Sequence, residues 1–271
     1  MSELPELKII RRSIARHATY KKIVGFSVFK LKLKGGSLKD LNKKVLKSSF
    51  KEADLWGKSI VLRLMSGYYV WVNMQTTGFF VYQNKRQLEK LKYIRAEFNF
   101  ANGSRLLFID PRGHSYFKLL NDKQLKQSFL KVGVDPLGKK FNYQALLDLI
   151  RGRRTSVKNF LTNDRVFLGI GSIYADEICF AARIRPDKSV KLLKKNEIRR
   201  LYSSIGIILK KSIEYGGLTK YLLINPGKLR FDRFLRIYNR AGEKCYRCGS
   251  KRIIKKKIGG VNSFYCSGCQ N

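Results

Sequence analysis

The first residues of the chain show the spacing of an amphipathic helix. Pro5 is followed by Leu7, Ile10 and Ile14, with arginines between these apolar positions. Apolar residues three and four positions apart fall on one face of a helix, so the pattern predicts a short helix that begins almost at the amino terminus. Its apolar face must pack on the rest of the chain, and the first residues are therefore expected to be held in place.

Residues 22–116 have a different rhythm, in which apolar and polar positions alternate. Lysine and leucine alternate over residues 30–34, and residues 59–64 place isoleucine and leucine at every second position. Such alternation is typical of strands with one buried face, and Ser66-Gly67 and Asn102-Gly103 have the composition of hairpin turns. The pattern predicts an antiparallel β-sandwich with the amino-terminal helix packed on it.

The second half of the chain has helical spacing. Residues 134–138 have the composition of a turn and suit a hinge, and after them apolar residues recur at helical intervals, the last series running from Ile198 to Leu209. That series stops at Gly216-Gly217, a common way to end a helix. The predicted fold class is multi-domain α+β, with a β-sandwich and flanking helices over residues 1–131, a helical domain over 132–236 and a metal-pinned β-hairpin over 237–271.

Basic residues exceed acidic residues throughout the chain. The 271 residues include 57 lysines and arginines and 19 aspartates and glutamates, so the formal charge is +38. So many positive charges repel one another in the folded protein unless an anion neutralises them. The excess therefore favours binding to nucleic acid over a role in solubility alone. The sequence has neither a secretory signal nor the roughly 18 to 20 uninterrupted apolar residues of a membrane span. We expect no membrane association and a cytoplasmic location, on the nucleoid if the source is bacterial.

Four of the five cysteines lie in the last 27 residues as two Cys-x-x-Cys pairs. In a chain without a secretory signal this pattern favours metal over disulfides. Four thiolates complete a tetrahedral site and leave no position for water or substrate, so we expect one structural Zn²⁺; a redox or iron-sulfur site is the alternative. The predicted ligands are Cys245, Cys248, Cys266 and Cys269.

Residues 168–177 read Leu-Gly-Ile-Gly-Ser-Ile-Tyr-Ala-Asp-Glu and place two glycines before a helical pattern. Glycines at a tight turn that opens a helix leave backbone amides able to bind a phosphate. Two helices that turn closely past each other would also require glycines there. The segment alone does not choose between these two interpretations.

Six segments together resemble, in order, the formamidopyrimidine-DNA glycosylase and endonuclease VIII family. The resemblance spans essentially the whole chain and implies a helix-two-turn-helix, a zinc-finger hairpin and two domains that clamp bent DNA, with the damaged nucleotide flipped out of the stack. It also implies a monomer bound to DNA. The segments are Ser2-Glu3-Leu4-Pro5-Glu6, Asp110-Pro111-Arg112, residues 134–138, residues 169–177, Ile237-Tyr238-Asn239-Arg240-Ala241-Gly242 and the four-cysteine carboxyl terminus.

The resemblance implies that the chemistry takes place at the amino terminus. In the family, a proline exposed by removal of Met attacks the sugar carbon, displaces the base and forms an imine, while the next glutamate handles protons. Here Ser2 stands at the proline position, followed by Glu3 and Glu6. After removal of Met1, Ser2 would expose a primary amine of pKa about 7.7 to 8.0, which can still form an imine. Capping of the helix is the alternative role for all three residues.

The family grips the phosphates of the flipped nucleotide with a Lys, a His, an Asn and a zinc-finger Arg. Lys58 matches the first and is also a candidate catalytic residue, while Asn73 and Ser172 replace the His and the Asn. Both can still donate a hydrogen bond, whereas Val261, at the Arg position, cannot.

The family also fills the hole that the flipped nucleotide leaves in the duplex. Arg112 matches the family Arg that faces the orphaned base, His114 replaces the wedge Phe, and Thr76 or Gln75 replaces the void-filling Met. Loss of bulky apolar fillers weakens the means of holding an ordinary duplex open. The remaining predicted DNA contacts are Lys158, Gly171, Tyr238 and Arg240.

The resemblance therefore implies a base-excision DNA-repair protein with glycosylase activity, possible imine-linked cleavage of abasic sites and a shifted lesion preference. The expected substrates are single-stranded, crosslinked or bulky damage, because unstacking the damaged base costs little free energy there. A protein of the same fold that binds lesions or DNA structures without chemistry is the alternative. A zinc-ribbon protein that binds structured RNA is a third hypothesis.

Overall fold

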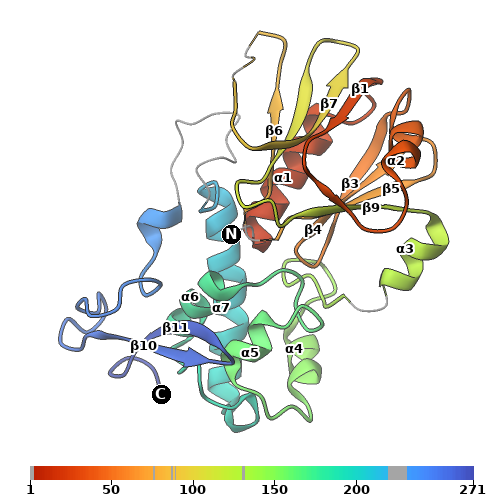
Figure 1. Ribbon diagram of the computed structural model, residues 1–271. Coiled ribbons are helices and arrows are strands. Elements are labelled where there is room, and N and C mark those ends of the chain that lie inside the picture. The colour runs from red at the N-terminus through yellow and green to blue at the C-terminus, as the bar shows by residue number, and fades with distance from the viewer. Residues whose placement is uncertain (1–2, 76, 87, 89, 130–131, 219–230) are drawn as a thin grey trace. The chain divides into compact units, whose positions relative to one another are not determined.

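The computed structural model describes the chain except residues 1–2, 76, 87, 89, 130–131 and 219–230 (Figure 1). Contacts within the chain divide it into two compact units. The first comprises Met1–Lys131 with Gly216–Leu229, and the second comprises Val132–Tyr215 with Arg230–Asn271. Among the described residues, no helix combines the length and the apolar character needed to cross a bilayer.

The first helix, α1 (Leu4–His17), confirms the amphipathic pattern at the amino terminus. Its residues Leu7, Ile10 and Ile14 are buried in the core of the first unit. Pro5 lies in the first turn, where its missing N–H costs no hydrogen bond because a helix start leaves those donors without intrahelical partners.

Two sheets form the predicted sandwich, and all strand pairs are antiparallel except β2 with β9. Apolar residues from both sheets and from α1 share one continuous core. One sheet has the order β2 (Lys32–Leu33), β9 (Tyr116–Leu120), β5 (Tyr69–Asn73), β4 (Ser59–Leu64), β3 (Phe50–Trp56), and the other β1 (Ile23–Val28), β7 (Ile94–Phe100), β8 (Arg105–Ile109), β6 (Phe79–Gln83).

Two further helices flank the sandwich, α2 (Leu38–Val45) and α3 (Asp122–Phe129). Alternation along β4 predicts that Val61 faces solvent, yet it is buried. A second apolar cluster explains the difference, because Val61 packs there with Trp56 and with Leu125 of α3. The outer face of this sheet is therefore partly covered.

The predicted turns are confirmed at Gly67 and Gly103, which adopt φ of 80° and 77° between paired strands. The lysine-leucine alternation at residues 30–34 forms only the two-residue β2. Gly35 and Gly36 follow it with φ of 78° and 82°, a conformation that cannot continue a strand. The two glycines therefore make β2 shorter than the alternation of lysine and leucine indicates.

The second unit is helical and ends in a hairpin. The long helix buries Ile198, Leu201, Ile205 and Leu209 and ends before the predicted glycine pair. The elements are α4 (Tyr143–Ile150), α5 (Val157–Thr162), α6 (Ser172–Ala182), α7 (Lys195–Glu214), the short 3-10 turns Val190–Leu192 and Phe231–Phe234, and the hairpin strands β10 (Ile253–Ile258) and β11 (Val261–Cys266). Helix α6 packs on α5, α7 and β11, so nearly all of its residues are buried.

Candidate functional site

Glu3 and Glu6 form a reciprocal capping box at the start of α1. The N–H of Glu3 donates to Oε2 of Glu6 at 2.9 Å, and the Glu3 carboxylate accepts the N–H of Glu6. The other oxygen of Glu6 accepts the N–H of Leu218 at 3.0 Å. Both acids are fully buried. Both residues therefore have the helix-capping role that the sequence allowed. Each carboxylate oxygen of Glu6 accepts a backbone N–H group.

Gly217 makes the contact with Glu6 possible. A Cβ at this position would lie 2.8 Å from Oε1 of Glu6, and the backbone has a φ of +75°. A side chain would therefore meet both a steric clash and an unfavourable backbone conformation. The segment after α7 thus holds the capping box from outside the helix.

The start of α1 points toward the hairpin turn that carries Lys58. Thr19, just after α1, pairs with Phe50 at the start of β3, and Nε of Arg11 donates to the carbonyl oxygen of Ala53 at 2.9 Å. The direction from Thr19 toward the amino terminus of α1 is therefore the direction from Phe50 toward the carboxyl end of β3. From the contact between Arg11 and Ala53, about 12 Å of helix leads to Glu3 and about 16 Å of strand leads to Lys58.

Strand register places the predicted phosphate contacts at that same end of the five-stranded sheet. Lys58 lies in the turn between β3 and β4, and its neighbour Ser59 pairs with Asn73 at the end of β5. Asn73 in turn pairs with Tyr116, the first residue of β9. The loops that follow β5 and precede β9 therefore emerge beside Lys58.

Asp110 ties these two loops together, a role that its local sequence does not reveal. Its buried carboxylate accepts the hydroxyl of Thr77 at 2.5 Å and the N–H groups of Ser115 at 2.8 Å and Arg112 at 3.3 Å. The hydroxyl of Ser115 donates to the carbonyl oxygen of Met74 at 3.1 Å. Burial acts to raise the pKa of Asp110, but these hydrogen bonds outweigh it and hold the pKa below its ordinary value.

The tied loops carry the residues expected to face the hole in the duplex. Gln75, Arg112 and His114 are exposed. Met74 is fully buried in the core, so it is no substitute for an apolar filler. Thr76 lies outside the described residues, as does Ser2. Among the described residues of the two loops, the exposed side chains are therefore polar except that of Pro111.

Replacing Asp110 with asparagine should loosen both loops. The amide cannot accept all three donors, and an unsatisfied buried donor costs about 1 to 3 kcal/mol of unfolding free energy. Urea unfolding of the full chain measures this loss, with Asp148→Asn on the exposed face of α4 as the control. Because the pKa of Asp110 lies below 3.8 in the folded protein, its contribution is present above that pH. The difference between the proteins should therefore shrink as pH falls below about 4, and equal stability at pH 7 would contradict the role.

In the second unit, the predicted phosphate-binding turn is the start of α6. Gly169 has a φ of 67°, Gly171 is the N-cap, and Ser172 is the first helical residue. The tip of the zinc hairpin lies close to α5, since a Cβ on Gly259 would meet Oδ1 of Asn159 at 2.2 Å. The helix amides at Ser172 remain the candidate anion site that the glycine pattern suggested.

Lys158 differs from the expectation of a DNA contact. Its side chain is only 1% exposed, and its ammonium bonds Oδ1 of Asp176 and the carbonyl oxygen of Ser172, each at 2.7 Å. Burial raises the pKa of Asp176 to about 7, because desolvation outweighs the attraction of this ammonium. The other carboxylate oxygen accepts the N–H of Phe264 at 3.2 Å. Lys158 thus holds α6 to α5 and is too buried to reach DNA directly.

Glu177, next on α6, anchors the segment that contains Tyr238. Its buried carboxylate accepts the N–H groups of Arg236, Ile237 and Tyr238 at 3.0 Å. The ring of Tyr238 packs on Phe264 of β11, with ring centroids 5.1 Å apart. The two acids of α6 therefore hold the start of the zinc finger and its strand β11, a function visible only from tertiary contacts.

Arg240, a further predicted DNA contact, has its guanidinium bonded within the zinc finger. Its guanidinium donates to the carbonyl oxygens of Arg236 and Lys244 and to Oε2 of Glu243, and it lies 3.5 Å from the ring centroid of Tyr246. These bonds use three of the five guanidinium N–H groups within the finger. Val261, by contrast, is 48% exposed at the start of β11 and offers no side-chain donor.

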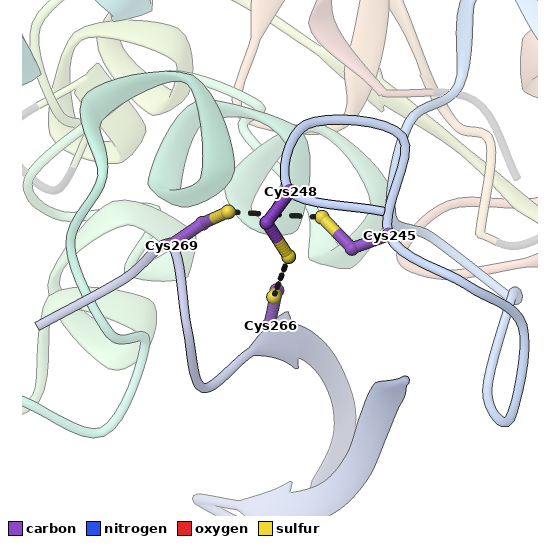
Figure 2. Close-up of side chains that lie close together, drawn as sticks. All are labelled: Cys245, Cys248, Cys266 and Cys269. Atoms are coloured by element: carbon purple, nitrogen blue, oxygen red, sulfur yellow. Dashed lines mark hydrogen bonds between the residues drawn. The ribbon is translucent and has the colours of Figure 1, made fainter. Parts of the chain in front are cut away.

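The four predicted cysteines converge on one site (Figure 2). Their sulfur atoms all lie within 4.8 Å of one another, and the pairs Cys245–Cys269 and Cys248–Cys266 are each 3.8 Å apart. A tetrahedron with Zn–S bonds of about 2.3 Å has edges of about 3.8 Å, so the sulfur positions fit Zn²⁺. The cysteines form a structural zinc-finger site.

A β-sandwich that holds two acids at the start of α1, followed by a helix-two-turn-helix and a four-cysteine zinc finger, is the architecture of zinc-finger DNA glycosylases. Residues 1–117 match the formamidopyrimidine-DNA glycosylase N-terminal domain, and residues 132–222 match the formamidopyrimidine-DNA glycosylase H2TH domain.

Full-length relatives give the same result. The formamidopyrimidine-DNA glycosylases of Pelotomaculum thermopropionicum and Mycoplasma pneumoniae are 33% and 30% identical, over 100% of this chain and 99% of each relative. Lactococcus lactis Fpg, in a complex with DNA containing an abasic site, has a TM-score of 0.89 at 25% identity and full coverage of both chains. The same enzyme in complex with DNA containing Fapy-dG gives a TM-score of 0.88 at 25% identity, over 99% of this chain and 100% of that one. The chain belongs to the formamidopyrimidine-DNA glycosylase family.

Proposed function

We propose that this protein is a DNA glycosylase that excises a damaged base, acting as a monomer in the cytoplasm. The observation that carries the proposal is the placement of Glu3. Its carboxylate is fully buried and fixed by the capping box, at the end of α1 that points toward Lys58. A carboxyl held rigidly beside the amino terminus is suited to take and return a proton during attack on a sugar carbon.

The other residues at this end of the sandwich support DNA binding. In the proposed complex Lys58 and Asn73 contact the phosphates of the flipped nucleotide, and Arg112 faces the orphaned base. The start of α6, at Ser172, offers backbone amides to a further phosphate. Glu6 positions the helix start, and Lys158 and Arg240 act through the elements that they hold together.

We propose further that the lesion preference is shifted toward damage in single-stranded, crosslinked or bulky sites. The exposed residues Gln75, Arg112 and His114 support this, because polar side chains are poor wedges between stacked bases. Val261 gives the zinc finger no side-chain donor to phosphate at the hairpin tip. An enzyme with weak means of opening a duplex acts best where the base is already unstacked.

The test compares base excision by the zinc-loaded protein on one lesion placed in single-stranded DNA, in a bulge and in a matched duplex. We expect faster excision from the first two, and weak or no activity on an 8-oxoguanine duplex. Efficient excision from that duplex would overturn the shifted preference while leaving the glycosylase assignment intact. A protein that excises nothing yet prefers distorted over intact duplex would be a silent lesion binder.

A further inference from the structure

A cationic cavity lies in the second unit at the end of α6 opposite the proposed phosphate-binding turn. Its volume is about 600 Å³, and the charged side chains that line it are five cations and one acid. Helix α6 is 11 residues long, so this cavity lies roughly 15 Å from Ser172. The charged residues are Arg183, Lys188, Lys194, Glu197, Arg200 and Arg247.

Two of the arginines are held in place by the last carbonyl groups of α6. Nε of Arg200 donates to the carbonyl oxygen of Ala182 at 2.8 Å, and Nη1 of Arg247 donates to that of Phe180 at 2.8 Å. The Arg247 guanidinium also lies 4.0 Å from the ring centroid of Phe180. Each guanidinium has five N–H donors, so these contacts fix its orientation and leave most donors for another partner.

Glu197, the one acidic side chain among the lining residues, does not by itself neutralise the five cations. Oε1 of Glu197 accepts the ammonium of Lys188 at 2.8 Å, and Oε2 accepts the N–H of Lys194 at 2.9 Å. Burial opposes ionisation of Glu197, but these bonds outweigh it and hold the pKa below its ordinary value. The Glu197 carboxylate is therefore charged, and both of its oxygens are bonded to residues that line the cavity. Arg183 and Lys194, both exposed, add two further cations at the rim.

The local density of positive charge exceeds that of the chain as a whole. Lysines and arginines make up 57 of the 271 residues, or about a fifth, but five of the ten residues that line the cavity. Glu197 and the thiolate of Cys269 in the zinc site offset part of the charge of the five cations, and the positive charge that remains favours an anion in the cavity.

We propose that this cavity is a second phosphate-binding site, separate from the site of base excision. Preoriented guanidinium groups and nearby ammonium groups recognise phosphate oxygens through charge-assisted hydrogen bonds. The volume admits a ligand of the size of pyrophosphate or a nucleotide. The phosphates come either from a small free ligand or from the backbone of a second nucleic-acid strand.

The experiment measures pyrophosphate binding to the zinc-loaded full chain by calorimetry. The test variant is Arg183→Gln with Lys194→Gln, and the matched control is Arg199→Gln with Lys210→Gln, two exposed residues of α7 outside the cavity. Both variants lose the same net charge. We expect wild type and control to bind alike and the test variant to bind at least about tenfold more weakly. Absence of binding to wild type, or equal weakening in both variants, would overturn the proposal.

A second arm distinguishes the two sources of phosphate. The protein is first saturated with a short damaged duplex and then titrated with a labelled single-stranded oligonucleotide or with pyrophosphate. Binding of the oligonucleotide that the test variant loses and the control keeps assigns the cavity to nucleic acid. Binding of pyrophosphate alone assigns it to a small ligand. Base excision should be unchanged in the test variant, and its loss would place the cavity in the excision site and overturn the separation.

Discussion

Replacing Cys248 with serine is expected to release the zinc ion and unfold the β10–β11 hairpin. The four sulfur atoms form a closed site, and loss of one thiolate removes a quarter of its ligands. Structural zinc contributes an apparent 10 to 16 kcal/mol in small zinc-finger peptides. A two-stranded hairpin has little stability of its own, so packing of Phe264 and Ile253 on Phe180 cannot replace the metal.

Metal analysis of the purified variant, together with limited proteolysis, checks this expectation. We expect loss of about one zinc per chain, rapid cleavage within residues 245–269 and weaker DNA binding. Cys179→Ser serves as the control, because Cys179 is buried in α6 and does not belong to the cluster. Full zinc content in the Cys248 variant would show that three of the cysteines suffice to hold the ion.

The parts of the fold that follow from local patterns were predictable from the sequence. Helical spacing located α1 and α7, and the cysteine spacing identified the zinc site. Each of these signals resides in residues that are near one another in the chain, or in chemistry that admits few alternatives. The extent of β2 was not predictable in the same way, because two glycines after it stop a pattern that alternation alone would continue.

Residues that act through distant partners were harder to interpret. Lys158 and Arg240 have the charge of a phosphate contact, but each finds acceptors inside the second unit. Asp110 belongs to the Asp110-Pro111-Arg112 motif, although its carboxylate bonds Thr77, 33 residues earlier in the chain. An aspartate followed by Pro-Arg-Gly signals a turn, but nothing in the local sequence shows which second loop the carboxylate will hold.

The same buried capping box that fixes Glu3 also makes its chemical role testable. Replacing Glu3 with glutamine keeps an oxygen that can accept the N–H of Glu6, so the free energy of unfolding should change little. The amide cannot exchange a proton, and excision should fall by a factor of about 10² to 10⁴ or to an undetectable level. Glu6→Gln is the matched control. It replaces one of two oxygens that accept backbone N–H groups, so it should lower stability more than Glu3→Gln.

Borohydride trapping on damaged DNA then identifies the nucleophile. If the amine of Ser2 attacks the sugar, wild type should form a covalent adduct, and Glu3→Gln should form none. A chain that retains Met1 should also form none, because the extra residue displaces the amine by about 3.8 Å. Water activated by Glu3 would instead release bases without an adduct and without strand cleavage. Intact mass of the cellular protein reports whether Met1 is removed. Undiminished excision by a well-folded Glu3→Gln protein would exclude Glu3 from both routes.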